Sequence, residues 1–253
     1  MVTSSYIIAC IAAVLAGFVN AIAGGGTLIT FPTLTALGIP PVVANITNTL
    51  ALCPGYFGGI YAQRSNFKSQ KGNLWKLLPV SILGGLTGGF LLLKLPESSF
   101  KTLIPYLILI ATALLAFQIP LKNWSDSRQK NQGSELIRNI GMYLLIFLAA
   151  VYGGYFGAGL GVILMGVLGL VINERLNKIN VLKQTLSFII NVTASIYFAF
   201  SGKAEWVFVL IMAIGAISGG FLGGKMVDKI PASILRYIVV FIGLTVALVY
   251  FIK

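Results

Sequence analysis

Residues 20–27 of the chain read NAIAGGGT, and residues 157–161 read GAGLG. Each glycine cluster follows a long apolar run and precedes a much shorter one, at 27–37 and at 162–172. Glycine has no Cβ, so the backbone can leave helical geometry at these points. At membrane depth, non-helical backbone is tolerated only where it faces protein or a water-filled cavity. The pattern therefore predicts one short broken helix in each half of the chain.

The composition predicts that lipid surrounds this protein. Of the 253 residues, 57% are hydrophobic and 9% are charged, and the mean hydropathy is +0.93. A soluble domain carries about 25% charged residues, so this chain has too few polar side chains to cover its surface. Helix-length apolar runs fall near 4–22, 42–62, 74–94, 101–120, 140–158, 178–200, 206–226 and 232–252. Each run is close to the ~20 residues needed to cross a bilayer, which indicates an all-α, multi-pass integral membrane protein.

The two halves of the chain repeat each other at a constant offset of 135 residues. Gly84, Gly85, Gly88 and Gly89 correspond to Gly219, Gly220, Gly223 and Gly224, and Lys94, Pro96 and Ser98 correspond to Lys229, Pro231 and Ser233. The spacing within these glycine groups is typical of closely packed membrane helices. We expect a first membrane repeat at 1–120, a polar cytoplasmic linker at 121–139 and a second membrane repeat at 140–253.

The distribution of basic residues favours inverted repeats of about five membrane segments each. If each short segment carries the chain across, thirteen basic residues share one side and four lie opposite. The four are Lys94, Lys101, Lys203 and Lys253; the thirteen are Arg64, Lys68, Lys71, Lys76, Lys122, Arg128, Lys130, Arg138, Arg175, Lys178, Lys225, Lys229 and Arg236. If the short segments are instead re-entrant and return to the same side, the split is only ten to seven. Because cytoplasmic loops carry the excess of Lys and Arg, we predict ten crossings with both termini outside the cytoplasm.

A polar cluster follows each short segment. Asn45, Asn48 and Thr49 are spaced i, i+3, i+4 and share one helix face, and Asn180, Lys183 and Gln184 repeat that face in the second half. A lysine within an apolar helix is costly unless it has a partner or extends to the headgroups, so Lys183 either binds an anion or snorkels to the surface. The N-terminus of each short helix also attracts anions, although the glycines could serve close packing alone. The candidate substrate-binding residues are Gly24, Gly25, Gly26, Thr27, Asn45, Asn48, Thr49, Gly159, Gly161, Asn180, Lys183 and Gln184.

These motifs resemble the sulfite exporter TauE/SafE family. The resemblance rests on the segment Ala21 to Leu28, on Pro32, on the Asn45-Ile-Thr-Asn-Thr cluster and on the second-half stretch that starts at Asn180. It implies a multi-pass permease of a prokaryotic plasma membrane that carries small anions, chiefly sulfite, sulfonates and related organosulfur compounds. The chain departs from the family pattern at Leu160, where a full triple glycine would stand, and it lacks a second-half proline equivalent to Pro32.

The sequence also limits the other functional classes. The net charge of +12 is carried by short loops between apolar runs, so it reflects membrane orientation and not nucleic-acid binding. The chain has no histidine, and its six acidic residues lie in loops or at segment ends, which leaves no support for an intramembrane enzyme, a metal site or a cofactor. An anion channel remains the alternative to a secondary transporter, and a homodimer is left open.

Overall fold

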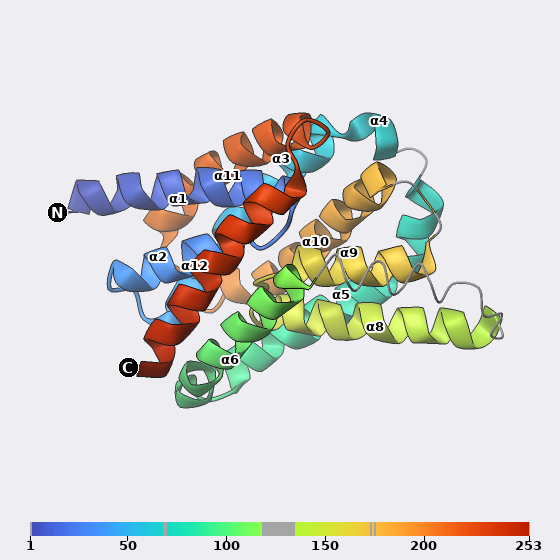
Figure 1. Ribbon diagram of the computed structural model, residues 1–253. Coiled ribbons are helices and arrows are strands. Elements are labelled where there is room, and N and C mark those ends of the chain that lie inside the picture. Colours follow the sequence, from blue (N-terminus) through green and yellow to red (C-terminus); the bar gives the residue numbers. More distant parts are fainter. Residues whose placement is uncertain (1, 68–69, 118–134, 173, 175, 253) are drawn as a thin grey trace.

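The computed structural model describes residues 2–67, 70–117, 135–172, 174 and 176–252, and over these residues the protein is helical with no strand (Figure 1). The helices are α1 (Val2–Ile22), α2 (Thr27–Ala36), α3 (Pro41–Ala62), α4 (Arg64–Phe67), α5 (Lys71–Lys94), α6 (Glu97–Ala116), α8 (Glu135–Tyr155), α9 (Leu160–Val171), α10 (Leu176–Ala199), α11 (Trp206–Met226) and α12 (Ala232–Ile252). All eight long apolar runs and both short ones correspond to helices, so the predicted all-α fold is confirmed. The predicted linker lies outside the described residues as far as residue 134, and α8 begins at Glu135.

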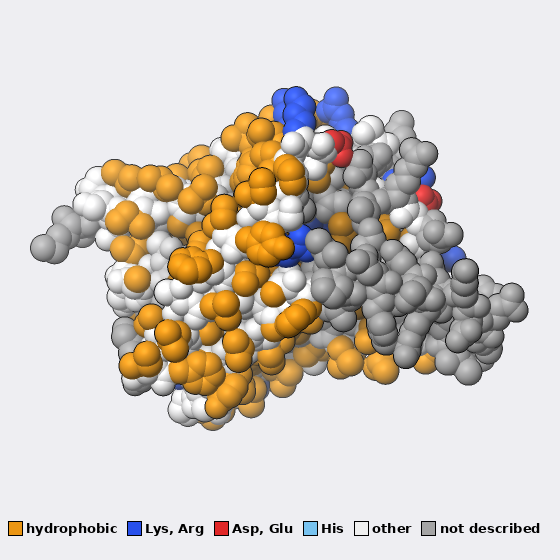
Figure 2. Space-filling view, viewed as in Figure 1, with side chains coloured by type: hydrophobic (Ala, Val, Ile, Leu, Met, Phe, Trp, Pro, Cys, Tyr) orange, Lys and Arg blue, Asp and Glu red, His pale blue; other side chains and the backbone are white. Residues whose placement is uncertain are grey.

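Six of these helices are long and apolar enough to cross a membrane. They are Thr3–Ile22, Lys71–Lys94, Glu97–Ala116, Lys178–Ala199, Trp206–Met226 and Ser233–Ile252. Hydrophobic side chains are spread over the described part of the face drawn in Figure 2, as a lipid-facing surface requires. On α12, for example, Phe241 is 72% exposed. The chain is therefore a multi-pass membrane protein.

Each half of the chain contributes one helix that packs against the other half. Helix α11 from the second half contacts α1 and α3 of the first, while α5 from the first half contacts α8 and α10 of the second. Glycines allow the close approach: a Cβ on Gly219 would overlap Val14 O of α1, and a Cβ on Gly88 would overlap Val151 O of α8. The prediction that these glycine groups serve helix packing is confirmed.

The short helices α2 and α9 fold back along the helices that precede them, α1 and α8 (Figure 1). The reversals use left-handed backbone, with φ of +85° at Gly24 and +91° at Gly25 in the first half, and +76° at Gly157 and +72° at Gly159 in the second. Only glycine adopts this region without a steric penalty. Leu160 begins α9 immediately after the second reversal, so the missing third glycine does not prevent it.

Aromatic side chains hold α2 in place. Phe31 is 1% exposed, and its ring centroid lies 5.3 Å from that of Phe156, just after α8, and 6.5 Å from that of Phe100 on α6. Tyr250 of α12 stacks on Phe31, and its hydroxyl lies 2.8 Å from Thr35 Oγ1. The end of α12 therefore packs beside α2, and both chain termini lie on the left of the molecule in Figure 1.

Candidate functional site

The two backbone reversals meet in the interior of the protein. A Cβ added to Gly24 would lie 3.1 Å from the backbone nitrogen of Val162 and 3.3 Å from Gly161 Cα. The chain just before α2 is thus in direct backbone contact with the first turn of α9. The positive ends of two helix dipoles come close together here among buried residues, where charges are screened less than in bulk water.

Lys183 of α10 reaches this meeting point. Its side chain is 1% exposed, and its Cδ and Cε would lie 3.6 Å and 3.7 Å from a Cβ on Gly161. Its Nζ donates a hydrogen bond of 3.3 Å to the backbone oxygen of Asn20, near the end of α1. The alternative that Lys183 snorkels to the headgroups is therefore wrong, because the side chain points into the protein.

No described acidic side chain forms an ion pair with Lys183. The ion pairs among the described residues are Lys101–Glu97 and Lys178–Glu174, both at partly exposed positions. An ammonium group has three donors, and the Asn20 carbonyl accepts from one of them. A buried cation whose remaining donors are unmatched is stabilised by any anion that fits beside it.

Asn20 also holds the first reversal in place. Its Oδ1 accepts a 2.7 Å hydrogen bond from Gly26 N, at the start of α2. Asn20 is 7% exposed, so this residue connects the end of α1, the start of α2 and Lys183 within one buried cluster. It was absent from the candidate residues, although a polar side chain near the end of an apolar run was the available signal.

Asn45 and Asn180 occupy corresponding positions and make corresponding contacts across the two halves. Asn45 Nδ2 donates to Tyr155 O, the last residue of α8, at 2.9 Å. Asn180 Nδ2 donates to Ala21 O, near the end of α1, at 3.1 Å, and to Gln63 Oε1 at 3.0 Å. Carbonyls at a helix end lack intrahelical partners, so these amides fasten the helix ends that precede the two reversals. Gln63 was not among the candidates either.

Asn48 lies opposite Lys183 in the repeat and faces the start of α2. Its Nδ2 donates a long, 3.4 Å hydrogen bond to Thr27 Oγ1, and its Oδ1 has no partner among the described atoms. Asn48 is 1% exposed, so this oxygen is buried. The first half thus presents an amide and a hydroxyl where the second half presents an ammonium group.

The remaining candidates lie around this centre and not within it. The Thr49 hydroxyl donates to Asn45 O in its own helix, and the amide of Gln184 packs beside Gly59. A Cβ on Gly25 would face Leu115 and Val239, while one on Gly159 would face Ala111. The structure therefore brings together Gly24, Gly26, Thr27, Asn48, Gly161 and Lys183.

A bundle of apolar helices with a buried cation between two broken helices is the architecture of a polytopic membrane transporter. The chain belongs to the sulfite exporter TauE/SafE family, whose family model matches residues 9–250. The resemblance noted in the sequence is thereby confirmed, and the chain is a member of a family of membrane transporters.

Three relatives are similar to nearly the whole chain. A probable membrane transporter protein of Haemophilus influenzae is 31% identical over 239 residues, covering 93% of this chain and 91% of that protein. The probable membrane transporter protein ORF9 of a Sinorhizobium species is 32% identical over 246 residues, covering 94% and 89%. The probable membrane transporter protein YfcA of Escherichia coli is 27% identical over 237 residues, covering 91% and 84%. No solved structure matches the chain significantly.

Proposed function

We propose that this protein is a secondary transporter of small anions, chiefly sulfite, sulfonates or related organosulfur compounds, across the plasma membrane of a prokaryote. The observation that carries the proposal is Lys183, which is 1% exposed and has no acidic partner among the described residues. The family relationship supports the same conclusion. A small anion is the ligand that matches an isolated buried ammonium group beside two helix N-termini.

The proposed site uses different residues for binding and for support. Lys183, Asn48 and Thr27 supply the side-chain donors, beside the backbone contact between Gly24 and Gly161. Asn20, Asn45 and Asn180 hold the ends of α1 and α8, so they position the reversals and do not touch the substrate. Gly25, Thr49, Gly159 and Gln184 form the surroundings of the site.

Inverted repeats of five membrane segments would place this site at mid-depth. The contacts of α1 with α2, α3 and α11 are matched by those of α8 with α9, α10 and α5, which supports a twofold relation between the halves. Helix α2 has 10 residues and spans about 15 Å, roughly half of the ~30 Å hydrocarbon core. If the C-terminal end of α2 lies near the bilayer surface, its N-terminal end lies near the middle of the bilayer. Alternating access requires a site at that depth that both halves share.

Both termini would then lie outside the cytoplasm. Arg64 packs on the ring of Tyr61, and Lys225 packs on the ring of Phe221. The two rings lie 6.4 Å apart, so the ends of α3 and α11 form one basic end of the molecule. We assign this end to the cytoplasm by the positive-inside rule. The termini lie away from it in Figure 1.

Transport into proteoliposomes tests the proposed function. Purified protein would be reconstituted, and the uptake of labelled sulfite, a short sulfonate, sulfate and chloride measured as a function of concentration. We expect saturable uptake of sulfite or the sulfonate, and competition between the two. A rate that rises linearly with concentration would indicate an anion channel, and an absence of flux for every anion of the panel would contradict the proposal.

A further inference from the structure

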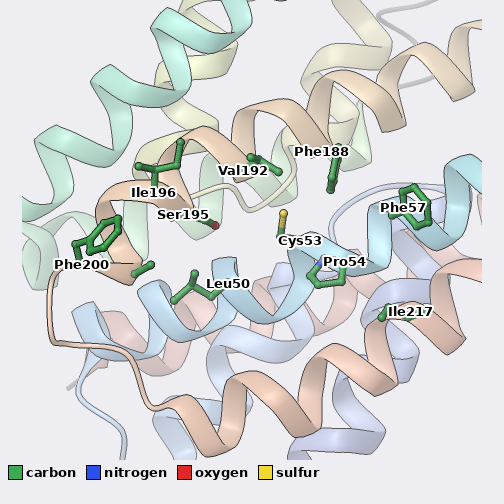
Figure 3. A pocket seen from close by; sticks show the side chains of 11 residues that line it. Leu50, Cys53, Pro54, Phe57, Phe188, Val192, Ser195, Ile196, Phe200 and Ile217 are labelled. Atoms are coloured by element: carbon green, nitrogen blue, oxygen red, sulfur yellow. The ribbon is translucent and has the colours of Figure 1, made fainter.

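An apolar groove of about 600 Å³ opens between α3, α10 and α11 (Figure 3). The groove is lined by Cys53 and Phe57 of α3, by Phe188 of α10, by Phe200 just after α10, and by Ile217 of α11. Phe200 is 88% exposed and Phe57 is 59% exposed, so the groove faces the lipid. An apolar hollow in contact with the hydrocarbon core is not stably filled by water, because its walls offer water few partners. It is suited to an acyl chain.

One end of this groove leads to a pair of cations. One turn beyond Phe57 lies Tyr61, and the guanidinium carbon of Arg64 lies 4.8 Å from the centroid of its ring. One turn beyond Ile217 lies Phe221, and Lys225 Nζ lies 4.3 Å from the centroid of that ring. The two rings are 6.4 Å apart, so both cations lie at the same end of the groove. In Figure 2, Lys and Arg side chains gather at the upper edge, over the ends of α3 and α11, with an acidic side chain beside them.

We propose that the groove and this cation pair together bind an anionic phospholipid, with an acyl chain in the groove and the phosphate at the end of the groove where Arg64 and Lys225 lie. Lys225 lies about 12 Å beyond Ile217 along α11, and Arg64 starts α4 just after the end of α3, seven residues beyond Phe57. This separation places the headgroup at the bilayer surface while the chain passes over Tyr61 and Phe221 into the groove. Basic pockets between membrane helices are suited to anionic headgroups.

Charge selects this occupant over two others. Neither Arg64 nor Lys225 forms an ion pair with a described acidic side chain, so a net negative headgroup is favoured over a zwitterionic one. A second copy of the chain, related by a twofold axis along the membrane normal, would bring the two cation pairs face to face, where like charges repel. The site uses none of the residues around Lys183, so it does not depend on the proposed transport function.

Lipid titration of the purified protein in detergent tests the proposal. Phosphatidylglycerol and phosphatidylcholine with identical acyl chains would be added, and binding followed by native mass spectrometry together with the melting temperature. We expect the phosphatidylglycerol to bind more tightly and to raise the melting temperature more. At about 1 kcal/mol per cation, the double variant Arg64→Gln, Lys225→Gln should bind phosphatidylglycerol about 30-fold more weakly.

Two further variants separate the parts of the site. Ala199→Trp fills the groove and should weaken phosphatidylglycerol binding although both cations remain. Lys94→Gln is the matched control, because Lys94 also lies over an aromatic ring, that of Phe90, at 5.9 Å but outside this groove, and it should leave lipid binding unchanged. Arg64→Lys keeps the charge and should retain the preference for phosphatidylglycerol.

Several results would overturn the proposal. They are equal affinity of the wild type for the two lipids, unchanged phosphatidylglycerol binding in the double variant or in Ala199→Trp, and equally large losses in Lys94→Gln. Competition by soluble glycerophosphoglycerol as strong as that by the lipid would show that the acyl chain contributes nothing. Conversion of a dimer to a monomer by Ala199→Trp, with phosphatidylglycerol binding intact, would make the groove a protein interface instead.

Discussion

Gly24→Ala is the substitution that most directly examines the contact between the two reversals. Gly24 has a φ of +85°, and placing an alanine in the left-handed region costs about 1–2 kcal/mol. The added methyl group would also lie 3.1 Å from Val162 N and 3.2 Å from the carbonyl carbon of Gly161. Both are backbone atoms, so α9 itself must move, and overpacking of this kind costs about 1–3 kcal/mol more.

Gly38→Ala is the matched control for this substitution. Gly38 has a φ of +91°, but a Cβ there would meet nothing within 4 Å. The control therefore retains the backbone strain and removes the steric contact. For a chain of this size, each kcal/mol corresponds to about 2–4 °C in melting temperature. We expect Gly24→Ala to melt several degrees below Gly38→Ala.

The assay is thermal unfolding of both purified variants in the same detergent, combined with anion uptake after reconstitution. Gly38→Ala should retain most of its transport, whereas Gly24→Ala should lose it, because the methyl group separates the starts of α2 and α9. Equal melting temperatures for the two variants would refute the direct contact between Gly24 and the start of α9, and with it the geometry of the proposed site.

Three other predictions concern the supports of the site, the coupling and the orientation. Asn45→Ala should lower stability by about 1–3 kcal/mol because it leaves Tyr155 O buried without a partner. Thr49→Ala should cost less because the Thr49 hydroxyl donates to the carbonyl one turn earlier in its own helix. Equal losses in unfolding experiments would contradict this. A cysteine added after Lys253, in a background lacking Cys10 and Cys53, should react with an impermeant maleimide on intact cells; labelling only from the cytoplasmic face of inverted vesicles would contradict external termini. We also expect that no intramembrane carboxylate couples transport to protons. Replacing each acid singly by its amide should therefore leave any proton-driven component of uptake intact. Loss of that component in one variant would contradict this and identify a coupling residue. The six acids are Glu97, Asp126, Glu135, Glu174, Glu205 and Asp228.

The helices could be predicted from the sequence because lipid imposes length and hydrophobicity on each segment. The runs near 206–226 and 232–252 match α11 and α12 closely. The role of Gly219 in helix packing could also be predicted from the sequence, because small side chains at helical spacing have few other uses in a membrane helix. The sequence predicted the start of α8 near residue 140, whereas the helix begins at Glu135. The stretch before residue 140 is polar, so the apolar signal begins later than the helix itself.

The partners within the candidate site could not be predicted in the same way. Lys183 donates to Asn20, 163 residues away, and no local pattern specifies a contact at that separation. Thr49 shares a helix face with Asn45 and Asn48, yet its hydroxyl is satisfied by the carbonyl one turn earlier, as is common for threonine in a helix. The sequence could therefore identify which residues share a face, but not which of them meet the opposite half.

The orientation of Asn45 and Asn180 was also beyond the sequence. Both were predicted as substrate-binding residues, and the structure adds that their amide nitrogens bond to carbonyls at the ends of α8 and α1. A helix that stops inside a membrane leaves such carbonyls unpaired, and an asparagine side chain from the neighbouring half satisfies them. The need for these contacts follows from the glycine reversals, but their geometry depends on how the halves pack.

Anion uptake by Lys183 variants tests the central claim most directly. Lys183→Met removes the charge and keeps the length of the side chain, and the loss of a hydrogen bond to a charged group costs about 1.5–3 kcal/mol, or roughly 10- to 150-fold in affinity. Lys178→Met is the control on the same helix, because Lys178 pairs with Glu174 at 2.9 Å near the surface. We expect Lys183→Met to fold and insert normally but to require a correspondingly higher sulfite or sulfonate concentration for half-maximal uptake, while Lys178→Met behaves like the wild type. Wild-type uptake by Lys183→Met would contradict the account.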